Sequence, residues 1–133
     1  MNIAAFFYGT LMTGFDRRRR AGIEGKLRNR RRGWTRAGLF DLGIYPAAIP
    51  DPDGCVWGEV YDMDDPPGVL AALDEIEGCR EGHPDQSLYT RHLYPVTLDT
   101  GDTLHAWVYF YNAPLGGAQR IDSGDYLQHV RMR

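Results

Sequence analysis

The first half of the chain is a series of short apolar segments separated by turns. Residues 3–8 are almost continuously apolar and are followed by Gly9, which predicts a buried strand that runs into a turn. A strong turn signal, Asp51-Pro52-Asp53-Gly54, lies further along. The remaining strand-like segments of this half are 22–32, 34–40, 45–50 and 55–61. This pattern predicts mainly β structure.

One segment has the period of an amphipathic helix. Asp64 or Asp65 is placed to cap its start, and Pro66 suits the first turn because amide hydrogens have no helical partner there. Gly78 is placed to end the helix in a left-handed conformation. The apolar residues at i, i+3, i+4 and i+7, which predict one buried face, are Val69, Ala72, Leu73 and Ile76.

The second half of the sequence predicts mainly a β-hairpin. Two strands, over 88–98 and 103–111, are joined by the turn residues 99–102. Two short helical pieces are expected, one within 13–20 and one over 125–130. We therefore expect a single α+β domain over residues 1–133, with a curved, mainly β core and few flanking helices.

Composition narrows the class of protein. A chain of 133 residues with 43% hydrophobic content can bury one core, which argues against disorder. No apolar run approaches the ~18 residues that span a membrane, and the N-terminal run does not resemble a signal peptide. Two cysteines and four scattered histidines predict neither a disulfide framework nor a metal site. A cytoplasmic protein without a metal is expected.

Charge is distributed unevenly along the chain. Residues 1–36 carry ten basic and two acidic side chains, and the remainder carries five basic and sixteen acidic ones. The basic block from Arg17 to Arg32 has two interpretations. It binds nucleic acid or another polyanion as a non-enzymatic binding module, or it pairs with the acidic remainder of the fold. The second interpretation is favoured, so nucleic acid is not expected as a partner.

Glu77 is the candidate acid/base. It lies at the C-terminal end of the predicted helix, where the helix dipole places partial negative charge. Both this position and burial disfavour the ionised carboxylate and raise its pKa, as a general base near neutral pH requires. The alternative is a solvated glutamate on the helix surface.

The turn over Tyr8, Gly9, Thr10 and Leu11 is the candidate anion site. Glycine tolerates unusual backbone angles, so a strand that ends in glycine can turn sharply, and successive amides in such a turn can converge on an anion. The alternative is an ordinary connection between a strand and a loop.

Three other side chains are candidates for the wall or rim of a pocket. Arg91 shares one strand face with Tyr89, and either pairs with Glu77, orders the rim or lies on the surface. Tyr45 and Tyr111, like Tyr109, line the pocket or belong to the core.

The chain resembles the γ-glutamylcyclotransferase-like family, which includes the AIG2-like γ-glutamylamine cyclotransferases. The matching segments run in the family's order: Phe7–Leu11, Leu39–Ala47, Gly58–Tyr61, Leu73–Gly78, Tyr89–Arg91 and Ser123–Tyr126. The resemblance implies a barrel-like core with a pocket at one end. It also implies that Glu77 is the acid/base and that the turn over residues 8–11 binds the glutamyl part of a substrate.

The implied reaction releases 5-oxoproline from a small γ-glutamyl amine or peptide. It needs no metal, nucleotide or other cofactor, because the substrate's own α-amine is the nucleophile. A small-molecule substrate is thus the expected partner, and the chain is expected to act as a monomer or small homo-oligomer.

Overall fold

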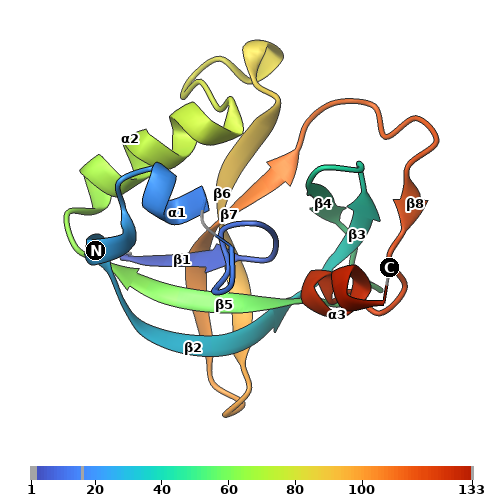
Figure 1. The fold of residues 1–133 in the computed structure, drawn as a ribbon, viewed down its shortest axis with the longest axis horizontal. Helices are drawn as coiled ribbons and strands as arrows, with labels where there is room; N and C mark the ends of the chain where they lie inside the picture. Colours follow the sequence, from blue (N-terminus) through green and yellow to red (C-terminus); the bar gives the residue numbers. More distant parts are fainter. Residues whose placement is uncertain (1–2, 16, 133) are drawn as a thin grey trace.

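Five strands close into a barrel in the order β1-β5-β2-β6-β7 (Figure 1). A computed structural model describes residues 3–15 and 17–132. The barrel strands are β1 Ala4–Phe7, β2 Leu27–Thr35, β5 Val56–Met63, β6 Tyr89–Leu98 and β7 Thr103–Tyr111. Neighbours are antiparallel except β1 and β7, which are parallel. This confirms the predicted α+β fold with a mixed, barrel-like core.

A second, three-stranded sheet lies beside the barrel (Figure 1). Its strands are β4 Pro46–Pro50, β3 Ala37–Asp41 and β8 Gln119–Arg120, with β3 in the middle. The terminal helix α3, Tyr126–Arg131, is held to β3 by a contact of 2.7 Å between His129 Nε2 and Asp41 Oδ2. Three short elements complete the chain: α1 Arg17–Arg20, η1 Glu24–Lys26 and η2 Pro84–Gln86.

The predicted break between two strands near Gly33 is wrong, because β2 continues through this residue. Gly33 pairs with Gly58 on one side and Leu98 on the other. A Cβ at this position would lie 2.9 Å from the carbonyl oxygen of Thr97, so the glycine allows β6 to approach closely. The strand ends instead before Arg36. Residues 22–26, predicted as strand, instead contain the turn η1.

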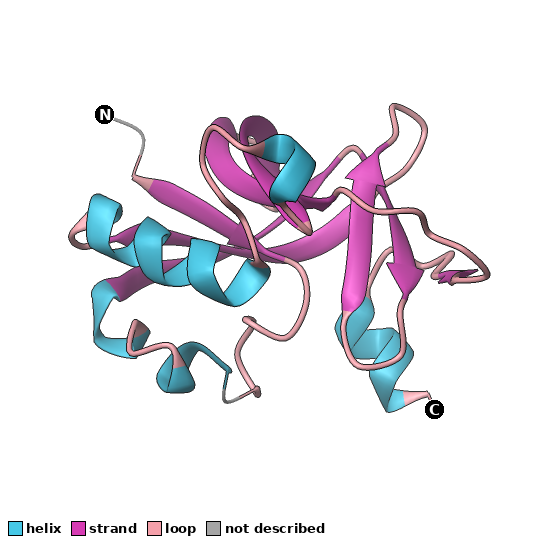
Figure 2. Cartoon of the chain, turned by 90° about the horizontal axis from the view of Figure 1, so that it is seen from above, coloured by secondary structure: helices cyan, strands magenta, loops and turns pink. Residues whose placement is uncertain are grey.

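Helix α2, Pro66–Glu77, lies along one side of the barrel (Figure 2). Asp65 caps its start by accepting a hydrogen bond from the amide of Gly68, and Gly78 ends it with φ of 65°, as the sequence predicts. Val69, Leu73 and Glu77, each four residues apart, are buried. The carboxylate of Glu77 therefore lies on the face that packs inward.

Candidate functional site

A narrow pocket opens where the end of β1, the C-terminal end of α2 and the start of β4 come together. Its volume is about 30 Å³. The lining residues are Phe6, Phe7, Tyr8, Gly9, Thr10, Leu11, Arg17, Tyr45, Pro46, Glu77, Tyr89 and Tyr109. The pocket thus joins the predicted acid/base to the predicted anion-binding turn.

Glu77 is the acidic residue among those that line this pocket, and it is only 8% exposed. Its carboxylate accepts no hydrogen bond from the residues that the structure describes. The cation beside it is Arg17, whose Nη1 is 3.9 Å from Oε1. Burial raises the pKa of Glu77, and the charge of Arg17 opposes that rise. The carboxylate therefore holds a proton more tightly than an exposed glutamate and has lone pairs free for a ligand.

The four residues of the turn 8–11 also line this pocket. Within the described ranges 3–15 and 17–132, the amides of Gly9, Thr10 and Leu11 donate to no acceptor. Buried amides are rarely left unpaired, so three in succession at a pocket wall are suited to bind an anion. The turn is closed by a hydrogen bond of 3.0 Å from the amide of Met12 to the carbonyl of Gly9.

The structure shows that Gly9 is required for close packing rather than for its backbone angles. We expected a glycine with unusual backbone angles, but the φ angle of Gly9 is not positive. A Cβ here would instead lie 2.7 Å from Cγ of Pro46. Gly9 therefore lets the turn pack directly against β4, and this contact forms one edge of the pocket.

Two tyrosines hold the pocket wall through their hydroxyl groups. The Tyr8 hydroxyl donates to the carbonyl of Tyr109 at 2.6 Å, and the Tyr89 hydroxyl donates to the carbonyl of Pro46 at 2.9 Å. Burial, followed by the nearby charge of Glu77, raises the pKa of both tyrosines. Both side chains are therefore neutral donors at neutral pH.

The other two tyrosine candidates occupy different places. Tyr45 lines the pocket, and its ring lies 5.7 Å from the guanidinium carbon of Arg17. Tyr111 does not line the pocket. It packs edge-on against the ring of Tyr89, with the ring centroids 5.2 Å apart. Tyr111 thus supports a wall residue from behind.

Arg91 is not among the residues that line the pocket, and of the alternatives open for it, pairing with Glu77 is not the one that the structure has. Its Nε donates to both carboxylate oxygens of Asp74, at 2.9 and 3.1 Å, and its Nη2 is 3.2 Å from Glu81. Tyr109, its partner across the β6–β7 hairpin, donates its hydroxyl hydrogen to the same carboxylate. This network fastens α2 to the hairpin and so fixes the orientation of Glu77 indirectly.

Sequence reasoning missed Arg17 as a pocket residue, because it treated residues 17–20 as one basic run. Its Nη1 donates to Thr10 Oγ1 at 2.9 Å, and its Nη2 donates to the carbonyl of Ile76 at 3.3 Å. No local signal separates Arg17 from the three arginines that follow it. Only its contacts with Thr10, Ile76 and Glu77 in the folded chain distinguish it from them.

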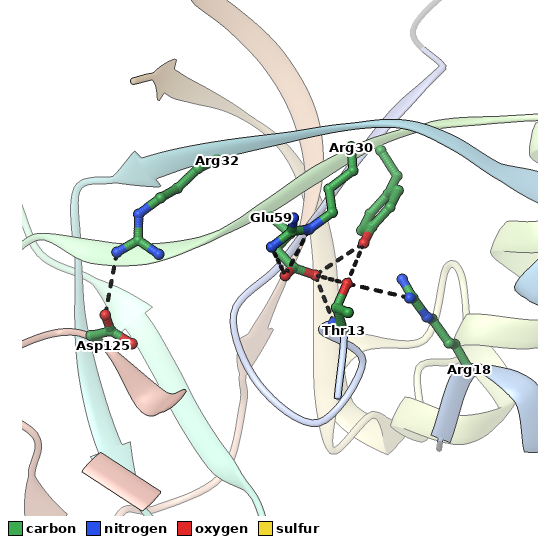
Figure 3. Close-up of polar contacts among 7 residues, drawn as sticks. Thr13, Arg18, Arg30, Arg32, Glu59 and Asp125 are labelled. Atoms are coloured by element: carbon green, nitrogen blue, oxygen red, sulfur yellow. Dashed lines mark hydrogen bonds and ion pairs between the residues drawn. The ribbon is translucent and has the colours of Figure 1, made fainter. Parts of the chain in front are cut away.

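The turn is anchored from behind by a buried carboxylate, Glu59 on β5, which is 6% exposed. Figure 3 shows Thr13, from the loop after β1, and Arg30, from β2, converging on it. Oε1 accepts from the amide of Thr13 at 2.7 Å and from the hydroxyl of Tyr61 at 3.1 Å. Oε2 accepts from Nη2 of Arg30 at 2.9 Å. Glu59 therefore fixes the loop that continues from the candidate anion-binding turn.

The basic block is largely paired with acidic residues. The arginines of β2 each have a carboxylate oxygen within 3.3 Å, as the pair of Arg32 with Asp125 in Figure 3 illustrates. The other three pairs are Arg28 with Asp64, Arg30 with Glu59 and Arg31 with Asp62. This arrangement supports the second interpretation of the block, in which it neutralises the acidic remainder.

Residues 3–15 and 17–132 contain no group of three or more His, Cys, Asp or Glu side chains able to hold a metal ion. None of the helices in these ranges has the length and apolarity needed to cross a bilayer.

Comparison with known proteins agrees with the geometry. Residues 5–128 match the family described as "Gamma-glutamyl cyclotransferase, AIG2-like". The chain is 38% identical over 89 residues to the γ-glutamylcyclotransferase family protein YtfP of Escherichia coli K12. That match covers 67% of this chain and 66% of the relative, so just under two thirds of the relative is spanned.

Solved structures share the fold over most of the chain. The YkqA protein of Bacillus subtilis superimposes with a TM-score of 0.72 at 25% identity, covering 99% of this chain and 42% of that protein. An AIG2-like protein of Mus musculus gives a TM-score of 0.63 at 27% identity, covering 81% of this chain and 76% of that protein. The likeness thus includes both the barrel and the segments that form the pocket.

Proposed function

Since this chain belongs to the AIG2-like family of γ-glutamyl cyclotransferases, we propose that it releases 5-oxoproline from a small γ-glutamyl amine or peptide. One observation carries the proposal. Among the residues that the structure describes, the buried carboxylate of Glu77 accepts no hydrogen bond, and it shares a pocket with three successive amides that donate none. This pairs a proton acceptor with an anion-binding site, as the cyclisation requires.

The amides of Gly9, Thr10 and Leu11 would hold the substrate's α-carboxylate. This places the neighbouring α-ammonium toward Glu77, which takes its proton. The freed amine attacks the γ-carbonyl carbon, so a new C–N bond closes a five-membered lactam. The original amide C–N bond then breaks as Glu77 returns the proton to the departing nitrogen. The second proton of the attacking amine passes to the released amine, which leaves as an ammonium ion. No water is consumed.

Much of the rate acceleration would come from geometry. An extended γ-glutamyl chain must fold so that its amine lies about 3–3.5 Å from its own carbonyl carbon. A narrow pocket walled by the rings of Tyr45 and Tyr89 would enforce that folded shape. Arg91 and Tyr111, which lie outside the pocket, would act by holding α2 and Tyr89 in place rather than by touching substrate.

The direct test is release of 5-oxoproline from a panel of γ-glutamyl amines and γ-glutamyl dipeptides, followed by chromatography of both products. We expect equal amounts of 5-oxoproline and free amine from at least one compound, with no free glutamate. Glutamate release would indicate hydrolysis instead. A wild-type protein that is folded but inert across the panel would refute the proposal.

The pH dependence should reveal the pKa of Glu77. Only the ionised carboxylate can accept the first proton, so kcat/KM should fall as the pH drops through the pKa of Glu77 in the free enzyme. Because burial raises this pKa from its ordinary value of 4.5 and Arg17 lowers it, Arg17→Gln should move the acid limb to higher pH. Arg19→Gln, which removes an exposed charge from the same helix, should leave the limb unmoved. An identical shift in both variants would contradict this assignment.

A further inference from the structure

Among the residues that the structure describes, no carboxylate oxygen lies closer to the guanidinium of Arg17 than 3.9 Å, its distance from Glu77. The arginines of β2 have carboxylates within 3.3 Å, whereas Nη1 of Arg17 lies 3.9 Å from Glu77. Its two hydrogen bonds within the described part of the chain go to neutral oxygens, of Thr10 and Ile76. A guanidinium has five N–H donors, so Arg17 keeps donors and charge available for a ligand.

The reaction geometry places the departing amine near this guanidinium. Glu77 must reach the departing nitrogen within hydrogen-bond distance to return the proton, and Arg17 lies 3.9 Å from Glu77. The side chain of Arg17 is 21% exposed, so it connects the pocket with solvent on the side where a leaving group must exit. A carboxylate on the carbon attached to the departing nitrogen would fall within its reach.

We propose that Arg17 is a specificity-determining residue that selects leaving groups carrying a carboxylate, so that the preferred substrates are γ-glutamyl-amino acids rather than γ-glutamyl amines without that charge. This inference rests on the proposed function. The fork of N–H donors of Arg17 matches a carboxylate in two parallel hydrogen bonds. A cationic leaving group would be repelled by the same charge.

The test compares two compounds of nearly the same shape, γ-glutamyl-alanine and γ-glutamyl-alaninamide. Their kcat/KM values are measured for the wild type, for Arg17→Gln and for Arg19→Gln. A hydrogen bond to a charged group corresponds to roughly 10- to 100-fold in affinity. For the wild type and Arg19→Gln, we expect kcat/KM to be at least about tenfold higher for γ-glutamyl-alanine than for γ-glutamyl-alaninamide. Arg17→Gln should lose this preference.

The ratio of the kcat/KM values for the two compounds separates selection of the leaving group from other roles of Arg17. A shifted pKa of Glu77, or a lost contact with the substrate's α-carboxylate, changes the turnover of both compounds equally and cancels in the ratio. Arg17→Lys, which keeps a point charge without the fork, should retain part of the preference. An equal loss for both compounds in Arg17→Gln, with the ratio unchanged, would overturn the proposal.

Binding measurements separate failure of this inference from failure of the proposed function. Calorimetry of both compounds is done on Glu77→Gln and on the double variant that also carries Arg17→Gln. Tighter binding of the acid that requires Arg17 supports selection, even if the wild type releases no 5-oxoproline. Equal affinities for the two compounds, or no binding of either, would contradict it.

Discussion

Glu77→Gln is expected to lower kcat by about 10²- to 10⁴-fold, the range that general acid–base catalysis contributes. The amide has nearly the shape of the carboxylate, so the pocket and its amides stay in place. It cannot accept a proton from the α-ammonium or return one to the leaving amine. The measurement is single-turnover release of 5-oxoproline with substrate at saturation. KM should change little, because the α-carboxylate is held elsewhere.

The same variant should not lose stability. Burial raises the pKa of Glu77 in the folded state above its unfolded value. The wild type therefore loses stability as the pH rises from the pKa of Glu77 in the unfolded state to its pKa in the folded state, and this loss remains at neutral pH. Gln removes that loss, so the free energy of unfolding of the variant relative to the wild type should increase from acid to neutral pH. Urea denaturation at several pH values measures this.

Glu75→Gln is the matched control for Glu77→Gln. Glu75 is exposed on the same turn of α2 and does not line the pocket. We expect it to leave both turnover and the pH dependence of stability unchanged. Near-normal turnover in Glu77→Gln would remove this carboxylate from the mechanism, whatever its environment.

Glu59→Ala is expected to have the second-largest effect, on stability and activity together. It leaves the amide of Thr13 without its acceptor, whereas the hydroxyl of Tyr61 keeps Thr13 Oγ1 as a partner at 2.9 Å. An unsatisfied buried donor costs about 1–3 kcal/mol, so we expect a loss of stability in this range. The pair with Arg30, whose own side chain is 60% exposed, adds less. Because Thr13 anchors the loop that follows the anion-binding turn, KM should also rise, measured well below the unfolding temperature.

Two comparison variants test whether Glu59 acts through the loop. Glu59→Gln keeps a carbonyl oxygen that can accept from Thr13, so it should retain most of the activity while losing the charge opposite Arg30. Asp64→Ala removes an exposed carboxylate that pairs with Arg28, and surface pairs of this kind contribute about 0–1 kcal/mol. Unchanged stability in Glu59→Ala would show that the buried network does not hold the loop.

Local sequence patterns were sufficient for the elements that carry the site. The period of α2, its cap at Asp65 and its end at Gly78 are set by contacts within a few residues, and they place Glu77 at the C-terminal end of the helix. The apolar run before Gly9 likewise predicted the strand that precedes the turn. The predicted buried face did not include Glu77, whose burial four residues after Leu73 was found only in the structure.

The remaining features of the site depended on how the barrel closes. Tyr8 bonds a residue 101 positions away, and Glu59 reaches Thr13 across 46 positions. The register of the β6–β7 hairpin places Arg91 beside Asp74. The packing of α1 places Arg17, and not the three arginines that follow it, beside Glu77. Sequence spacing specifies which face of an element a side chain occupies, whereas its partner is decided by which distant element packs against that face. The sequence by itself therefore predicted the candidate carboxylate and the candidate amide turn. Only the tertiary structure decided which cation and which anchoring carboxylate accompany them, because these partners come from distant elements.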